Sequence, residues 1–192
     1  MLKSRIYLCL TAAALNLLFA APAGAAEEQK DKDTYDQNTV IKDATAFLGK
    51  GAEGIGGVVE KAFKDHGRPN GYIKGEEVSG AFVVGLRYGD GTLTLKNKGS
   101  RIVHWQGPSV GFDVGGNASK AFVLVYNLQN IDNIFQRFPA VDGSLYFVAG
   151  TSINYHQSDK IILAPIRLGV GLRFGINVGY MHYTRTKSWN PF

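Results

Sequence analysis

Few residues in this chain have the types and spacing that a reaction would need. The four histidines are isolated in sequence from other metal-ligating side chains and lie at positions 66, 104, 156 and 182. His156 lies near Asp159, but two residues do not make a metal site. A sheet would still be able to bring His104 or His182 close to Asp113. Neither the H-E-x-x-H pattern nor a phosphate loop occurs. The sequence therefore predicts no catalytic residue, no metal site and no enzyme.

One glycine pattern resembles a cofactor motif. Residues Gly49 to Gly54 satisfy G-x-G-x-x-G. In a dinucleotide-binding protein that motif follows a strand and opens a βαβ unit. Here no strand is expected before it and no βαβ unit after it, so we predict no bound cofactor.

Seven aromatic residues are the candidates for ligand binding. Most fall on the apolar side of an alternating segment, and they are Tyr88, Trp105, Phe112, Tyr126, Phe147, Phe174 and Tyr180. The simplest interpretation is that they fill a core, because aromatic side chains dominate core burial. The alternative is an apolar cavity for an acyl chain or another envelope ligand, whose polar end the hydroxyls and the indole nitrogen would orient.

The N-terminus has the pattern of a secretory signal peptide over residues 1–25. A short basic start is followed by an apolar stretch and by small residues before Glu27, which predicts cleavage after Ala25 or Ala26. The only cysteine, Cys9, leaves with this segment, so the mature chain would form no disulfide. We therefore expect an exported protein. Residues 26–37 are polar and charged, which predicts a disordered tether.

The mature chain is only mildly basic. Removal of the two basic residues of the signal leaves 19 basic residues against 16 acidic ones, a net charge near +3. A charge this small argues against a nucleic-acid partner. The sequence leaves the oligomeric state open.

Two kinds of periodicity divide the remaining chain. Residues 38–66 show an amphipathic helical pattern, interrupted by Gly49 and Gly51, which fits either two short helices or one helix. From residue 71 to 192 the pattern alternates as in strands, with a predicted hairpin that turns at 89–91 and further strands at 109–114, 120–127, 144–155 and 160–163. A helical pattern at 130–138, ended by Pro139, interrupts the strands. We predict a mainly β fold: a small closed antiparallel β-barrel with an N-terminal helical segment and one short inserted helix.

The segment 166–180 is a two-faced ribbon. Its even positions are apolar and its odd positions are glycine, arginine or asparagine. We expect the apolar side to point into the barrel and the glycines to let the ribbon bend as the barrel closes.

A transmembrane barrel of the outer membrane is the alternative architecture. It would also be exported and rich in glycine, and Phe192 would serve as its assembly signal. However, Asn190 and Pro191 stand where an alternating final strand is expected. Residues 121–126 are apolar on both faces, which suits a strand between a core and a covering helix. The sequence therefore favours a soluble barrel.

Several motifs resemble known families. The glycine-rich run 80–91, followed by Trp105-Gln106-Gly107-Pro108 and by Gly115-Gly116, resembles the SYLF domain. From about Tyr72 to Phe192 the chain is more similar to a periplasmic family of Gram-negative bacteria, the EipA-type envelope-integrity family. The stretches 71–117 and 161–192 carry this likeness.

The resemblance implies a soluble periplasmic β-barrel that supports cell-envelope integrity, with no reaction assigned. SYLF domains elsewhere look like lipid binders that act through a basic N-terminal helix. In 38–65 the lysines are offset by acidic residues, so attraction to anionic lipid would be small and at most a peripheral membrane contact is expected. We expect a lipid or an envelope glycan precursor as partner; the alternative is a purely structural interaction protein.

Overall fold

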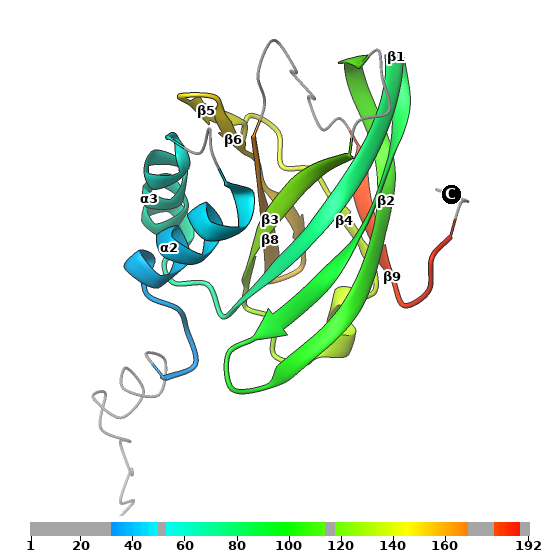
Figure 1. The fold of residues 1–192 in the computed structure, drawn as a ribbon. Coiled ribbons are helices and arrows are strands. Elements are labelled where there is room, and N and C mark those ends of the chain that lie inside the picture. Colours follow the sequence, from blue (N-terminus) through cyan, green and yellow to red (C-terminus); the bar gives the residue numbers. More distant parts are fainter. Residues whose placement is uncertain (1–31, 50–52, 114–117, 169–178, 189–192) are drawn as a thin grey trace, which may run out of the picture.

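The computed structural model describes residues 32–49, 53–113, 118–168 and 179–188, without the side chains of 80–84 and 109–113. The predicted signal peptide and residues 26–31 lie outside this part of the chain. In the described residues, two helices, a strongly curved antiparallel sheet and a short 3-10 helix make up the fold (Figure 1).

The two helices lie on one side of the sheet. Helix α2 spans Gln37–Leu48 and helix α3 spans Ile55–His66. The Asp36 carboxylate caps α2 by accepting from the Thr39 N–H at 2.9 Å. Each helix ends at a glycine with positive φ, 86° at Gly49 and 75° at Gly67. Of the two arrangements that the sequence allowed, the structure has two short helices.

The sheet has nine strands. They are β1 (Gly71–Leu95), β2 (Gly99–Asp113), β3 (Ala118–Tyr126), β4 (Arg137–Pro139), β5 (Tyr146–Val148), β6 (Thr151–Ile153), β7 (His156–Ser158), β8 (Ile161–Leu168) and β9 (Tyr180–Thr184). Their order is β4-β9-β2-β1-β3-β8-β6-β5, and β7 also pairs with β8. The sheet forms a half-barrel that spans 235°. The mainly β, antiparallel character is confirmed; closure of the barrel is not confirmed. A single bridge between Ala140 and His156 joins the chain after β4 to β7.

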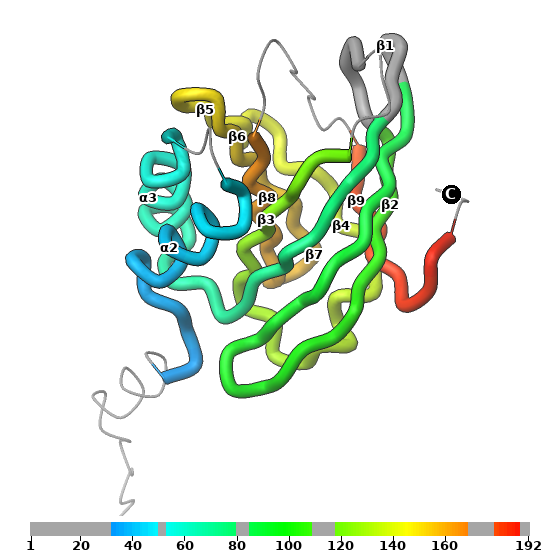
Figure 2. Tube along the Cα trace, viewed as in Figure 1, coloured from blue at the N-terminus to red at the C-terminus, as the bar shows by residue number. Residues whose placement is uncertain are grey.

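The predicted turn at residues 89–91 is wrong. These residues lie inside β1, and the chain reverses at Asn97 (φ 61°) and Gly99 (φ 89°) instead. Strand β1 doubles back on itself, so its two halves lie side by side (Figure 2). A Cβ on Gly75 would lie 2.3 Å from the Asp90 carbonyl oxygen. Glycine is therefore needed here for close packing of backbones rather than for a turn.

Two apolar cores lie on opposite faces of the sheet. The inner core fills the half-barrel, and the outer core lies between the sheet and the two helices. Strand β3 contributes to both: Val123 and Val125 face the inner core, whereas Phe122 and Leu124 face the outer one. The expectation that 121–126 lies between a core and a covering helix is therefore correct.

The predicted orientation of the ribbon at 166–180 is wrong for its described part. Ile166 and Leu168 belong to the outer core, under the helices. Arg167, from the side with small or basic residues, contacts Glu77 inside the half-barrel. The same Glu77 carboxylate accepts a hydrogen bond from Trp105. These apolar side chains therefore pack against the helices, and not against the barrel interior as the alternating pattern predicted. Residues 169–178 lie outside the described residues.

The inserted helix is shorter than predicted. Ile131–Ile134 forms a 3-10 helix, which the Asn130 side chain caps. The following residues form strand β4 because they pair with β9, with Arg137 opposite His182. Pairing with another strand therefore overrides the local helical pattern.

The last part of the predicted tether is packed against the domain. Thr34 is 6% exposed, and its carbonyl oxygen accepts from the Lys96 ammonium at 2.5 Å. The Tyr35 N–H donates to the Pro69 carbonyl oxygen at 2.8 Å. Residues 33–35 are therefore held by the folded domain.

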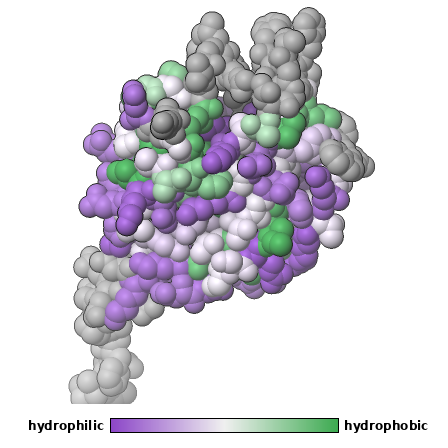
Figure 3. Space-filling view, in the orientation of Figure 1, coloured by the Kyte–Doolittle hydropathy of each residue, from purple (hydrophilic) through white to green (hydrophobic). Residues whose placement is uncertain are grey.

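The visible surface is mostly hydrophilic, with apolar side chains in small patches (Figure 3). Among the residues that the structure describes, no helix is long and apolar enough to cross a membrane.

Candidate functional site

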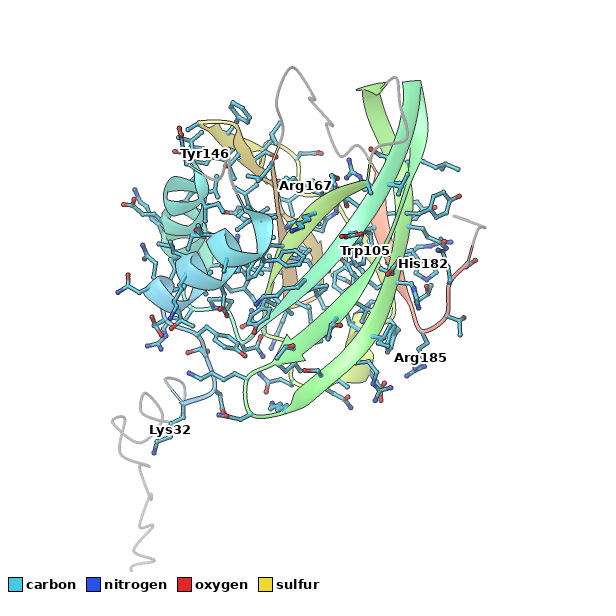
Figure 4. The ribbon with its side chains drawn as sticks, viewed as in Figure 1. Lys32, Trp105, Tyr146, Arg167, His182 and Arg185 are labelled. Carbon is cyan, nitrogen blue, oxygen red and sulfur yellow. The ribbon has the colours of Figure 1, made fainter. Side chains whose placement is uncertain are left out.

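A charged network crosses the interior of the half-barrel. Glu77 of β1 is 3% exposed and accepts from the Arg167 guanidinium of β8, with Nε–Oε1 at 2.5 Å and Nη2–Oε2 at 3.2 Å. Arg87, from the other half of β1, places Nε 3.6 Å from the same carboxylate. The indole Nε1–H of Trp105 on β2 donates to Glu77 Oε2 at 3.3 Å. Glu77 therefore connects three strands. Figure 4 labels two of its partners, Trp105 and Arg167.

The arginines keep Glu77 ionised. Burial alone would favour the neutral acid, but the charges of Arg167 and Arg87 and the hydrogen bonds outweigh it and lower the pKa of Glu77 to about 2. A carboxylate in this state neither donates nor takes up protons near neutral pH. Its role is to hold neighbouring side chains in place.

The network continues to the seam between β4 and β7. Arg167 Nη1 donates to Asn154 Oδ1 at 3.1 Å, and the Asn154 amide lies 3.0 Å from His156 Nε2. His156 Nδ1 donates to the Phe138 carbonyl oxygen at 3.2 Å, so Nε2 is the acceptor. Burial, and then the charge of Arg167, lower the pKa of His156 to about 3. His156 is therefore a neutral structural residue at neutral pH.

A cleft of about 250 Å³ opens beside this network. Both halves of β1 line it, together with β2 and the chain after β9. Its residues are Glu76, Val78, Tyr88, Gly89, Asp90, His104, Trp105, Gln106, Ala118, Lys187 and Ser188. Trp105 belongs to both sites, because it lines the cleft and donates to the buried Glu77.

Glycines on β1 make room for this indole. A Cβ on Gly89 would lie 2.2 Å from Trp105 Cε2, and a Cβ on Gly75 would lie 2.6 Å from Cη2. The ring therefore lies directly against the β1 backbone. Any larger residue at either position would displace the indole or the strand.

The polar groups of the cleft face one another across strands. Asp90 is directly opposite His104 in the register of β1 and β2, and Gln106 is opposite Tyr88. The sequence left Asp113 open as a partner for a histidine, but the register places Asp113 opposite Ala81. His104 Nδ1 is buried and has no hydrogen-bond partner in the described part of the chain.

Of the seven aromatic candidates, the structure brings two together. Tyr88 and Trp105 line the cleft. Tyr126 lies in the outer core, Phe147 is 54% exposed on β5, and the Tyr180 ring lies 5.0 Å from the Arg137 guanidinium. The side chain of Phe112 and all of Phe174 lie outside the described residues. A ligand-binding role for these residues stays a prediction.

Sequence reasoning missed the carboxylates and the amide of the cleft. The sequence pattern places Asp90 in a turn, gives Gln106 only as part of a motif and does not single out Glu76. Strict alternation along one continuous strand 71–95 would have placed 76, 88 and 90 on one face. In the described ranges, no three histidine or acidic side chains are grouped closely enough to hold a metal ion.

Comparisons with known proteins agree with this fold. A family model described as EipA, envelope integrity protein A, matches residues 33–192. A crystal structure of a beta-barrel-like, uncharacterized protein from Brucella abortus is 47% identical, with a TM-score of 0.76, over 83% of this chain and 99% of that one. None of the curated proteins compared with the chain matches it.

Proposed function

Because the chain belongs to the envelope integrity protein A family, we propose that it supports the cell envelope by binding an envelope glycan in the cleft beside the half-barrel, without catalysing a reaction. The observation that carries this proposal is the lining of the cleft. Tyr88 offers a partly exposed aromatic ring, and Asp90 and His104 offer polar groups, whereas Trp105 and Gln106 in the wall of the cleft are only 2% and 3% exposed. Ligand sites typically combine apolar surface with a few polar groups in this way.

The size of the cleft and the filled inner core favour a small cyclic guest over an acyl chain. The cleft is smaller than the roughly 300–1,000 Å³ typical of sites for drug-sized ligands. It is therefore suited to one ring of a longer glycan. The inner core, where the sequence analysis placed an acyl chain, holds fully buried side chains such as Ile73, Leu93 and Phe138. This filling favours a guest beside the half-barrel over one inside it.

The two buried titratable groups of the charged network are poorly suited to acid–base catalysis. Glu77 and His156 have pKa values of about 2 and about 3, far from neutral pH. General acid–base catalysis needs a group that titrates near the working pH. The proposal places the mature protein in the periplasm, since residues 1–25 have the pattern of a cleaved signal peptide. Fractionation and N-terminal sequencing of the mature protein test this: recovery with the cytoplasm, starting at Met1, would contradict it.

Tryptophan fluorescence tests glycan binding directly. The chain has two tryptophans, so a Trp189→Phe background leaves Trp105 as the only reporter. Titration with glycan fragments from the cell envelope should shift the emission of Trp105, and native mass spectrometry should detect the bound fragment. Tyr88→Ala should weaken binding at least tenfold without lowering the melting temperature by more than a few degrees.

The matched control is Tyr146→Ala. Tyr146 is 37% exposed on β5, beside α3 and away from the cleft (Figure 4). Binding should be unchanged in this variant. If glycan fragments leave Trp105 emission unaltered, or if both tyrosine variants lose binding equally, the proposed function is wrong. In that case, a strain that produces only the Tyr88→Ala protein should also resist detergents as well as the unmodified strain does.

A further inference from the structure

The two end strands of the sheet differ in how they are protected. Strand β4 is first in the strand order and β5 is last, so each has one side without a neighbouring strand in that order. Strand β4 carries the exposed residues Arg137 and Pro139, and the bridge between Ala140 and His156 joins the chain after it to β7. Charged residues and proline are common means by which proteins keep an edge strand from pairing with another chain. The β4 edge is therefore protected.

Strand β5 has none of these protections. Residues 143–158 include no Asp, Glu, Lys, Arg or Pro. Within the described part of the chain, β5 pairs only with β6, and it lies at the end of the sheet beside α3 (Figure 1). Four apolar side chains in and near it are exposed: Val141 39%, Leu145 43%, Tyr146 37% and Phe147 54%. An uncharged apolar edge of this kind favours association with another strand.

The register determines which backbone groups of β5 face outward. The turn between β5 and β6 has two residues, Ala149 and Gly150, with φ of 44° and 77°. In such a hairpin the pair that closes the turn, here that of Val148, is hydrogen-bonded, and the next pair is not. Phe147, opposite Ser152, belongs to this next pair, so its N–H and C=O point away from β6. These two groups have no partner among the described residues.

An extended strand is the partner that satisfies these backbone groups. A lipid surface would leave the N–H and C=O of Phe147 unpaired, which is costly in hydrocarbon. A second copy of the chain offers the same free groups on an antiparallel strand. Because residues 143–158 carry no charged side chain, two copies of this hairpin meet without repulsion between like charges. With a two-fold axis at Phe147, this residue exchanges both hydrogen bonds with its counterpart.

We propose that two copies of the protein associate through their β5 edges, which pair antiparallel about a two-fold axis at Phe147. The association does not depend on glycan binding in the cleft. The four exposed apolar side chains offer roughly 300 Å² per copy, less than the about 800 Å² per partner of a standard stable interface. The dimer should therefore be weak and reversible, with a dissociation constant on the order of 100 µM.

Sedimentation velocity of the mature protein at increasing concentration measures this association. The sedimentation coefficient of the unmodified protein should rise between about 10 and 500 µM, as expected for a weak interface. Phe147→Lys should remain monomeric, because it removes the apolar contact and places two like charges opposite each other. The matched control is Ile102→Lys, which changes an exposed apolar residue of β2 (65% exposed) and should associate as the unmodified protein does. Both variants should keep the melting temperature within a few degrees, because both positions are exposed.

Single cysteines test the geometry of the pair. The only cysteine of the chain, Cys9, lies in the predicted signal peptide, so the mature protein provides a background without thiols. The Cα atoms of a hydrogen-bonded antiparallel pair lie about 5.5 Å apart, which a disulfide can span. Phe147→Cys should therefore form covalent dimers under mild oxidation, whereas Ile102→Cys should do so at about a tenth of the rate or less.

Several results would overturn the proposed dimer. They are a monomer at the highest concentration, equal association of Phe147→Lys and the unmodified protein, and equal rates of crosslinking for the two cysteine variants. Flotation of the monomer with vesicles of phosphatidylethanolamine and phosphatidylglycerol, lost in Phe147→Lys, would assign the β5 edge to a lipid surface instead. The titration of Trp105 with glycan fragments is independent of all these measurements, so the proposed function stands or fails separately.

Discussion

Replacement of Glu77 by glutamine is the most informative perturbation of this fold. The substitution keeps the size of the side chain and removes the charge that the buried Arg87 and the partly buried Arg167 share. Arg87 and Arg167 would then lose the carboxylate that they contact, in an interior where water compensates poorly. Removal of one partner from a buried ion pair typically costs about 3–5 kcal/mol.

The pKa of Glu77 leads to a similar magnitude. It falls from 4.5 to about 2 on folding, which corresponds to about 3 kcal/mol of stability at neutral pH. Because the folded pKa is the lower one, this stabilisation is complete above pH 4.5 and is lost as the pH falls through 2. Glu77→Gln should therefore be about 3–5 kcal/mol less stable at pH 7, and the difference from the unmodified protein should shrink between pH 4.5 and 2.

Urea denaturation monitored by circular dichroism at several pH values measures this difference. Glu76→Gln is the matched control, because the neighbouring carboxylate is exposed and should cost less than about 0.5 kcal/mol. A loss below about 1 kcal/mol for Glu77→Gln, with stability curves parallel at all pH values, would refute the reasoning. The arginines would then be stabilised by partners other than Glu77.

Three further predictions follow from local contacts. Gly89→Ala should cost about 1–3 kcal/mol in urea denaturation and shift Trp105 emission, because its Cβ would lie 2.2 Å from the indole. The control is Gly56→Ala, which should be neutral or stabilising because a Cβ there would have no other atom within 4 Å. The folded pKa of His156, about 3, lies below its ordinary 6.5, so its contribution to stability is complete above pH 6.5 and is lost as the pH falls toward 3. His156→Gln should flatten the melting-temperature profile in that window, and an unchanged slope would contradict this. Asp36→Ala should cost about 1 kcal/mol through loss of the α2 cap, whereas Asp36→Asn should retain most of it; equal losses in thermal melts would show that the cap is not the cause.

Local patterns were sufficient for some elements. Alternation with apolar residues on both faces placed 121–126 between two cores, and the structure has β3 there. Helical periodicity interrupted by glycine led to the segment that forms α2 and α3. In each case the element is decided by which faces of the segment are apolar, so the periodicity of its apolar residues is enough to predict it.

Other features depend on partners that are distant in sequence. Gly89 and Gly91 have the composition of a turn. They are glycines because the second half of β1 packs closely against Trp105 and against the first half of the same strand. The direction of Ile166 depends on helices more than a hundred positions earlier in the chain. The cleft joins positions 76 and 90 of β1 to positions 104 and 187, and no periodicity connects β1 to these two later positions. The sequence therefore indicated the aromatic walls of the site and not its charged rim.

The long separation between Glu77 and Arg167 also bears on how the chain folds. Ninety positions separate these residues, and the second arginine belongs to the last third of the chain. Strands β1, β2 and β3 are consecutive and can pair early, since closing short loops is fast. During that stage Glu77 and Arg87 must stay hydrated until β8 arrives, so dehydration of the charged interior becomes a late step. Folding should consequently be slowed by substitutions in the β1–β2 turn, while loss of Arg167 should mainly accelerate unfolding.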